Sequence, residues 1–239
     1  MQLVISQSMY FPWVGLLEQV KLADAFVHYD DVQFTRGFYN RVQIRSESST
    51  RWLTVPTKKH PRETLIDHVL VDDSFDWREQ HRNTLTQYYR HSPYFEDMIG
   101  VFDDAHSIHA TSLADVSRES IMAMVRYFGL NNRCRFIPSA SLDVHGRSSE
   151  RLLAICRKLE ATVYITGHGA RNYLDHELFE SNGVEVRYMN YQKIPYPQSG
   201  NEFTPFVSGL DLIANCGRNG AKHICSGTVS WKEFANGSH

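Results

Sequence analysis

The sequence of 239 residues contains no run of about 18 consecutive apolar residues, so none of its segments reads as a membrane-spanning helix. Its first residues contain neither a basic leader nor a long apolar segment, which argues against secretion and predicts a cytoplasmic protein. No two of its four cysteines form a C-x-x-C pair, which favours reduced thiols. Cys216 and Cys225, with His223 between them, match no standard zinc spacing, so no metal site is predicted.

The sequence also lacks an excess of charge of either sign. It has 25 basic and 27 acidic residues, and the basic ones are dispersed along the chain. This balance argues against binding to a nucleic-acid polymer and against an acidic interaction tail. The G-x-S-x-G, P-loop and dinucleotide G-x-G-x-x-G motifs are all absent. No pattern in the sequence indicates an oligomeric state.

What the sequence does have is an alternation of short apolar runs with helical patterns. Leu3–Ile5 reads as a buried strand, Pro12 suits the first position of a helix, and residues 25–29 read as a second strand. Further strand-like runs cover residues 134–137, 162–166 and 184–188, with helical patterns between them. This order predicts an α/β fold with a Rossmann-like parallel sheet of about five strands.

The remaining segments are expected to form an insertion and a helical cover on that sheet, within a single α/β domain spanning residues 1–239. An insertion around residues 40–70 contains an alternating pattern typical of a β-hairpin, and residues 75–129 carry helical patterns that would form a helical cover. Residues 191–203, which include two prolines, predict an extended surface loop, and residues 207–215 a helix. The final residues are expected to fray.

In open α/β sheets ligands bind beyond the carboxyl ends of the strands, so the first polar loop is the first candidate site. Gln7, Tyr10 and Trp13 lie in this loop and at the start of the following helix. Free N–H groups at a helix start suit a phosphate or carboxylate, and the aromatic rings can stack on a base or a sugar. The alternative is that the aromatic residues only cap the core.

The second polar loop follows the second strand and offers groups for proton transfer. Asp31 is a candidate general base, and His28 is another because histidine titrates near neutral pH. Gln33 follows them and can hydrogen-bond a substrate. A turn closed by an aspartate cap explains the same residues without catalysis.

Other polar residues in predicted loops could bind a substrate. Asn40 and Arg41 can hold a sugar hydroxyl or a carboxylate, and Lys58 can neutralise a phosphate, although a pair of lysines is also common in surface turns. Gly167 follows a predicted strand and would let the backbone approach a ligand closely. The neighbouring candidates are His168, for proton transfer or binding, and Arg171, for a phosphate.

Several motifs resemble those of the WbqC-like protein family. The first is Gln7-x-x-Tyr10-x-Pro12-Trp13-x-Gly15, followed by Asp30-Asp31-Val-Gln33-Phe34. Asn40-Arg41, Thr166-Gly167-x-Gly169, Tyr196-Pro197-Gln198 and Ser208-x-Leu210-Asp211-Leu-x-x-Asn215-x-Gly217 continue the likeness along nearly the whole chain. In this chain Gly209 replaces the apolar residue that is usual near the closing helix.

The resemblance implies a role in surface polysaccharide biosynthesis, such as that of O-antigen. It implies a transferase or ligase that forms an amide by placing a glycyl, aminoacyl or other acyl group on an amino sugar, with a nucleotide-linked sugar as the small-molecule substrate. The donor would be an acyl-CoA thioester or an acyl-adenylate made with ATP. It adds Tyr196, Gln198 and Asn215 to the substrate-binding candidates. The alternative is a non-catalytic protein that binds a sugar nucleotide or a glycan within a biosynthetic complex.

Overall fold

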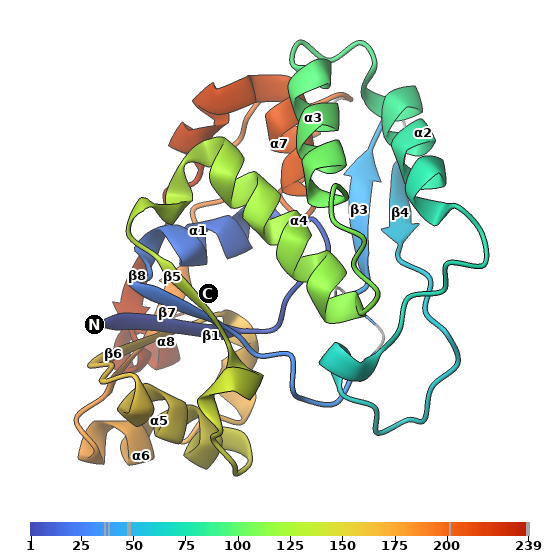
Figure 1. Cartoon of the computed structure of the whole chain (residues 1–239). Helices are drawn as coiled ribbons and strands as arrows, with labels where there is room; N and C mark the ends of the chain where they lie inside the picture. Colours follow the sequence, from blue (N-terminus) through green and yellow to red (C-terminus); the bar gives the residue numbers. More distant parts are fainter. Residues whose placement is uncertain (36, 38, 47–48, 201, 238–239) are drawn as a thin grey trace.

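The computed structural model describes residues 1–35, 37, 39–46, 49–200 and 202–237 (Figure 1). Within them a six-stranded sheet has the order β5-β2-β1-β6-β7-β8. The strands are β1 (Gln2–Ser6), β2 (Ala25–His28), β5 (Arg135–Pro138), β6 (Val163–Thr166), β7 (Glu185–Asn190) and β8 (Gly227–Ser230). The first five are parallel, and β8 pairs with β7 in the antiparallel direction.

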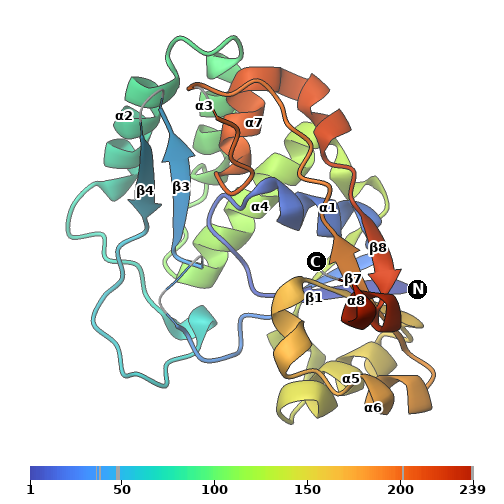
Figure 2. The same cartoon turned by 180° about the vertical axis from the view of Figure 1, so that it is seen from behind.

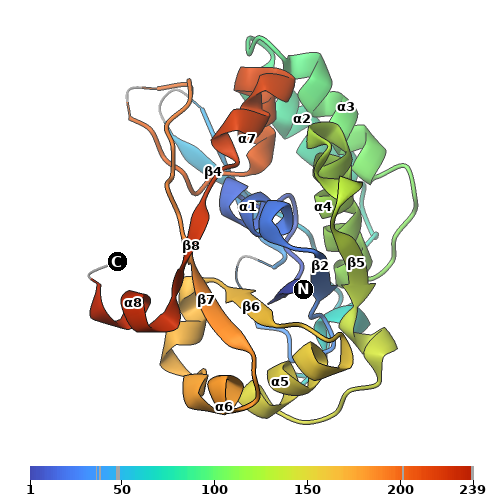
Figure 3. The same cartoon turned by 90° about the vertical axis from the view of Figure 1, so that its left-hand side faces the viewer.

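Helices cover both faces of this sheet (Figures 1 and 3). One face carries α1 (Val14–Leu22) and α4 (Leu113–Phe128), and the other carries α5 (Ser148–Lys158), α6 (His176–Ser181) and α8 (Trp231–Asn236). Successive residues of a strand point to opposite faces, so Val4 joins the apolar cluster of the first face, whereas Leu3 and Ile5 join that of the second. The central strands β1, β2 and β6 are buried on both faces, which explains their continuous apolar runs.

A separate hairpin and a group of helices extend the first face of the sheet. The hairpin pairs β3 (Arg41–Arg45) with β4 (Thr50–Thr54), and the helices are α2 (Trp77–Tyr89), α3 (Phe95–Ala105) and α7 (Gly209–Cys216). Short 3-10 turns occupy residues 66–68, 130–132, 139–142, 168–172 and 217–223. The buried side chains of hairpin and helices belong to the same apolar cluster as α1 and α4.

The predicted α/β class, the Rossmann-like parallel sheet, the inserted hairpin and the helical cover are confirmed. The expectation that the final residues fray is wrong for residues 227–236, which form β8 and α8. The main-chain groups of residues 227–230 pair with β7, Ser230 and Glu233 cap α8 reciprocally, and Phe234 stacks on Tyr188. The β7 strand and Tyr188 lie about forty residues away in the sequence, so local pattern does not reveal these contacts, whereas the Ser230–Glu233 cap is a local signal that the sequence analysis did not use.

In the part of the chain that the structure describes, no helix is long and apolar enough to cross a membrane. The same part contains no group of three or more His, Cys, Asp or Glu side chains that could hold a metal ion. All four cysteines are free thiols.

Candidate functional site

A cavity of about 910 Å³ lies where the winding of the sheet reverses, between β1 and β6. From β1 the chain proceeds to β2 on one side, whereas β6 and β7 follow on the other side, and such a switch point is the usual ligand site of doubly wound sheets. Gln7 after β1, Tyr29 after β2 and Gly167 after β6 all line this cavity. The loops beyond the first, second and fourth parallel strands therefore meet at one place.

Aromatic side chains form a large part of the wall of this switch-point cavity. Trp13, the N-cap residue of α1, packs against Tyr191 with ring centroids 4.9 Å apart and against Phe206 at 5.6 Å. The side chain of Gln19 donates a hydrogen bond to the hydroxyl of Tyr191 over 2.7 Å, which fixes that ring. The other aromatic lining residues are Tyr10, Tyr29, Tyr39, Tyr164 and Tyr173. Walls of this kind can bury flat ligand groups such as a base or the apolar face of a sugar.

The charges that line the cavity are positive. Arg41 at the start of β3 and Lys193 in the segment after β7 are its cations, and no carboxylate occurs among the described lining residues. The guanidinium of Arg41 lies 4.4 Å from the ring centre of Trp52, and the ammonium of Lys193 lies 5.4 Å from that of Phe206. The cavity is therefore suited electrostatically to an anionic ligand.

The cap of α1 at Trp13 and the backbone at Gly169 border this cavity. α1 begins at Val14 and has no acidic residue in its first turn, so its N-terminal N–H groups present a positive dipole end. A Cβ atom at Gly15 would lie 2.3 Å from the Trp13 ring, so glycine allows the indole to cover the start of the helix. A Cβ atom at Gly169 would meet nothing within 4 Å, which leaves room beside the backbone for a ligand.

His168 is the histidine that lines the cavity. Its Nε2 lies 2.7 Å from the carbonyl oxygen of Met189, so this nitrogen carries a proton and donates it to the carbonyl. In the tautomer that this hydrogen bond selects, the lone pair is on Nδ1. Tyr191 and Phe234 pack against the imidazole at 5.2 and 4.8 Å between ring centres, which holds its orientation. This arrangement provides an oriented proton acceptor.

His28 lies outside the lining residues, in a buried cluster beside the same loops. The hydroxyl of Ser8 donates to Asp30 Oδ2 over 2.8 Å and accepts from Nδ1 of His28, also over 2.8 Å. Arg118 pairs with the fully buried Asp30 at 2.8 Å. Burial, with a smaller contribution from Arg118, lowers the pKa of His28 to about 3, so this imidazole is neutral near pH 7. The cluster ties β2 and α4 to the loop after β1.

Asp31 likewise does not line the cavity, because its carboxylate is paired behind it. Ser139 donates to Oδ1 over 2.5 Å, and Arg151 forms an ion pair with Oδ2. The Arg151 guanidinium lies 5.0 Å from the ring centre of Tyr29, which does line the cavity. Asp31 thus supports Tyr29 through Arg151.

Some of the remaining candidates from the sequence line the switch-point cavity, and others do not. Gln7, Tyr10, Trp13, Arg41, Gly167 and His168 come together in the switch-point cavity. Gln33 and Asn40 instead donate to backbone carbonyl groups, and Lys58 and Arg171 are exposed outside the lining. The Tyr10 hydroxyl points to His81 Nδ1 at 3.0 Å, and burial raises the pKa of this fully buried tyrosine well above its ordinary value.

Tyr196, Gln198 and Asn215 gather around a buried carboxylate that the sequence motif contained but did not assign. Asp211, at the start of α7, accepts hydrogen bonds from the Tyr89 hydroxyl at 3.0 Å and from Gln198 Nε2 at 2.9 Å. The same Gln198 nitrogen lies 2.9 Å from the Tyr196 hydroxyl, and Asn215 donates to the carbonyl oxygen of Asp211 over 2.8 Å. Burial raises the pKa of Asp211, and the hydrogen bonds that Tyr196, Tyr89 and Gln198 make to its carboxylate oppose this rise.

Sequence reasoning missed several lining residues. Tyr29 directly follows β2, so the strand-end rule alone would have identified it. Lys193 and Phe206 lie in the proline-containing segment between β7 and α7, and nothing in the local sequence marks them. Figure 2 shows the course of this segment between the two elements. Lys193 and Phe206 reach the cavity because this segment folds back between β7 and α7, where Ser208 N–H donates to the Gln43 carbonyl oxygen at 2.8 Å.

Comparison with known proteins places the chain in a family. The pattern of the WbqC-like protein family matches residues 7–223, a range that includes the loops around the switch-point cavity. A protein of Mycobacterium tuberculosis (strain ATCC 25618 / H37Rv), described as "Uncharacterized protein Rv1507c", is 29% identical over 236 residues, which covers 93% of this chain and 97% of that protein. No solved structure matches the chain. By the extent of the family match, the chain belongs to the WbqC-like protein family.

Proposed function

We propose that the protein forms an amide on an amino sugar, with a nucleotide-linked sugar as substrate, in the biosynthesis of a surface polysaccharide. The group transferred is a glycyl, another aminoacyl or an acyl group. Family membership suggests the polysaccharide role. The observation that carries the substrate class is the switch-point cavity of about 910 Å³, which has aromatic walls, Arg41 and Lys193 as its cations, and no carboxylate among its described lining residues. A sugar nucleotide combines a flat base, a sugar and an anionic diphosphate, and so matches this wall.

The two cations would bind the diphosphate. Arg41 is held over Trp52, so little side-chain freedom is lost when its guanidinium contacts a phosphate. Lys193 has a φ of 49°, a left-handed conformation uncommon outside glycine, and such strained residues concentrate at ligand sites. Trp13 and Tyr191 would pack against the base or the sugar ring, and Gln7, whose side-chain amide has no hydrogen-bond partner among the described residues, would bind a hydroxyl group.

His168 would accept the proton that amide formation releases. The amine nitrogen attacks the acyl carbonyl carbon, a C–N bond forms, and the bond to the thiolate or adenylate leaving group breaks. The amine proton passes to Nδ1 of His168, the nitrogen left free by the hydrogen bond to Met189. We assign this role to His168 rather than to His28 or Asp31, because those two side chains are engaged in Ser8 and Arg151 contacts outside the lining. The donor remains either acyl-CoA or an acyl-adenylate formed with ATP.

Activity can be tested in one assay. The protein is incubated with UDP-linked amino sugars, a panel of acyl-CoA thioesters, and amino acids with ATP, and the sugar nucleotide is monitored by mass spectrometry. A mass gain supports the proposed transfer. His168→Gln should then reduce kcat strongly with little change in KM, and His145→Gln, at a histidine whose side chain is 93% exposed, should change neither. Equal kcat values for His168→Gln and wild type would remove His168 as the base.

The alternative is a sugar-nucleotide or glycan-binding protein without catalytic activity, and the same cavity supports it. Arg41→Gln and Lys193→Gln should each weaken binding of a UDP-amino sugar about tenfold, which corresponds to about 1.4 kcal/mol. Arg51→Gln serves as the matched control, because Arg51 is an exposed arginine on the paired strand and does not line the cavity. Binding without any mass gain across the donor panel would favour the binding protein.

A further inference from the structure

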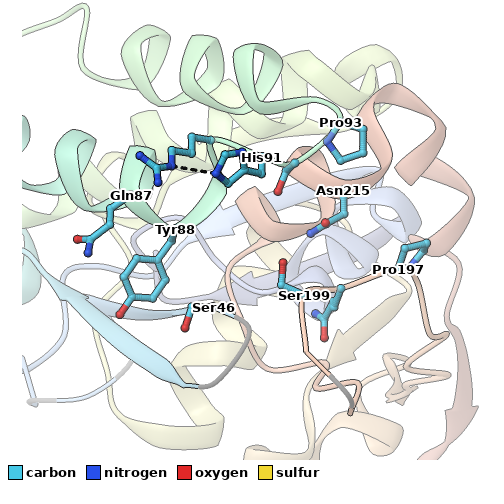
Figure 4. A pocket seen from close by; sticks show the side chains of 11 residues that line it. Ser46, Gln87, Tyr88, His91, Pro93, Pro197, Ser199 and Asn215 are labelled. Atoms are coloured by element: carbon cyan, nitrogen blue, oxygen red, sulfur yellow. Dashed lines mark hydrogen bonds between the residues drawn. The ribbon is translucent and has the colours of Figure 1, made fainter.

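A second cavity of about 620 Å³ lies apart from the switch-point cavity, at the far end of the hairpin. The C-terminal end of α2 and the turn into α3 form one side, and the 197–199 segment and α7 form the other (Figure 4). The two cavities share no lining residue. Its volume falls within the range of roughly 300–1,000 Å³ that is typical of small-molecule sites.

The floor of this second cavity is held by partly buried hydrogen bonds. The Gln198 amide oxygen accepts from the N–H of Thr204 at 3.0 Å, while its nitrogen contacts Asp211, a fully buried carboxylate. The Arg45 guanidinium donates to the Ser199 carbonyl oxygen over 2.7 Å and so binds the segment to the hairpin. The surface is therefore formed before any ligand arrives, which reduces the free energy lost to ordering on binding.

The side chains that face the second cavity combine hydrogen-bonding groups with flat apolar surfaces. Gln87 and Asn215 supply amides from opposite sides, with Ser46 and Ser199 between them (Figure 4). Asn215 uses its Nδ2 on the Asp211 carbonyl, which leaves its amide oxygen as an acceptor. The ring of Tyr88 and two prolines add apolar faces. This mixture matches a saccharide, which presents hydroxyl groups on its edges and C–H groups on its faces.

The positive charge in the second cavity favours a ligand that carries an anionic group. Arg90 lies at the C-terminus of α2, and its Nε donates to Nε2 of His91 over 3.1 Å, so its terminal guanidinium nitrogens remain available. No carboxylate occurs among the described residues that line the cavity. A planar guanidinium with free donors suits a carboxylate or phosphate group. We propose that this cavity binds an acidic saccharide, with Arg90 on its anionic group and with Gln87, Tyr88 and Asn215 on the sugar.

Strand β3 connects the second cavity to the switch-point cavity, so one saccharide chain could reach both. Strand β3 starts with Arg41, which lines the switch-point cavity, and leads to Ser46, which lines the second one. Five residues of strand span about 17 Å, so a saccharide of a few units could extend from one region toward the other. This inference goes beyond the proposed function and does not depend on catalysis, because a protein without transferase activity would still bind the saccharide.

The experiment is an NMR titration of the isotope-labelled full chain with 3′-sialyllactose and digalacturonate as acidic saccharides, and with lactose and inorganic phosphate as separate probes. At least one acidic saccharide should bind with a dissociation constant of about 1 mM or below, a modest affinity for a few hydrogen bonds. Arg90→Gln and Gln87→Ala should each weaken this binding about tenfold. Gln80→Ala is the matched control, because Gln80 is an exposed glutamine two turns earlier in α2 and outside the cavity.

The outcomes are decisive in each direction. Binding of an acidic saccharide that is weakened by Arg90→Gln and Gln87→Ala, but not by Gln80→Ala, supports the proposal. The proposal is overturned if neither acidic saccharide binds at about 10 mM. It is also overturned if lactose or phosphate alone binds as tightly, since the site would then lack the charge or the sugar selectivity. None of these results depends on the mass-gain assay, so failure here leaves the proposed function standing, and the reverse also holds.

Discussion

The stability of the protein should fall steeply in mild acid because of buried neutral histidines, and His106 offers the cleanest test. It follows α3 and packs against Phe102, with ring centres 4.4 Å apart, and against Trp77 at 5.6 Å. Its Nδ1 lies 2.9 Å from the Phe102 carbonyl oxygen and so donates to it, while Nε2 is buried without a hydrogen-bond partner among the described residues. A proton on Nε2 would therefore be a buried charge without a partner.

Burial is the main reason that the pKa of His106 is lowered from 6.5 to about 4. Below pH 6.5 the unfolded chain binds a proton that the folded protein does not, so the free energy of unfolding decreases as the pH falls from 6.5 to about 4. The slope is about 1.4 kcal/mol per pH unit for one histidine, and about 2 kcal/mol of stability is lost between pH 7 and pH 5. His28 and His81 act in the same direction, because their pKa values are lowered to about 3 and about 4.

The perturbation is His106→Leu, which removes the titrating ring and keeps an apolar side chain. Urea unfolding followed by tryptophan fluorescence at pH 7 and pH 5 gives the free energy of unfolding for wild type and variant. The variant should lose about 2 kcal/mol less than wild type over this pH range, whatever its absolute stability. The raised pKa values of Asp30 and Asp211 contribute in the opposite direction, but they are common to both proteins.

The control for this experiment is His145→Leu, because the His145 side chain is 93% exposed. In His145→Leu, the free energy of unfolding should fall between pH 7 and pH 5 by the same amount as in wild type. If wild type and His106→Leu lose the same free energy of unfolding between the two pH values, His106 is not a buried neutral histidine and the reasoning is refuted.

Other substitutions test the packing around the site by urea unfolding. Gly209→Ala should destabilise the protein by about 1–3 kcal/mol, because its Cβ would lie 2.3 Å from the terminal methyl group of Met124 and 3.2 Å from a backbone oxygen. Gly100→Ala, inside α3, should instead stabilise the protein by about 0.5–1 kcal/mol, because a Cβ there meets nothing within 4 Å. Equal effects of the two substitutions on the free energy of unfolding would contradict both expectations. Ser8→Ala should cost about 1–3 kcal/mol, because it leaves buried groups of His28 and Asp30 without a hydrogen bond, and an unchanged unfolding midpoint would show that the cluster contributes nothing.

The departure at Gly209 illustrates how structure changes the meaning of a sequence observation. In the sequence it is a missing apolar side chain at the start of a helix. In the structure its N–H donates to the carbonyl oxygen of Pro12 over 2.8 Å, so α7 approaches the loop after β1 without space for a side chain. The glycine allows the closing helix to pack against the element that carries Trp13.

Sequence pattern alone was enough for the α/β class and for the five parallel strands, because burial leaves continuous apolar runs and amphipathic helices repeat every three to four residues, but it did not reveal the antiparallel β8. It also located the loops of the switch-point cavity, because parallel strands bring their carboxyl ends to one edge. Which side chains in those loops face the cavity was decided only by the tertiary structure. Asp31 turns to Arg151 and His28 to Ser8, whereas Lys193 and Phe206 arrive from a segment without local pattern. Side-chain direction depends on partners far along the chain, such as the ion pair that holds Asp31, and those partners meet only in the folded protein.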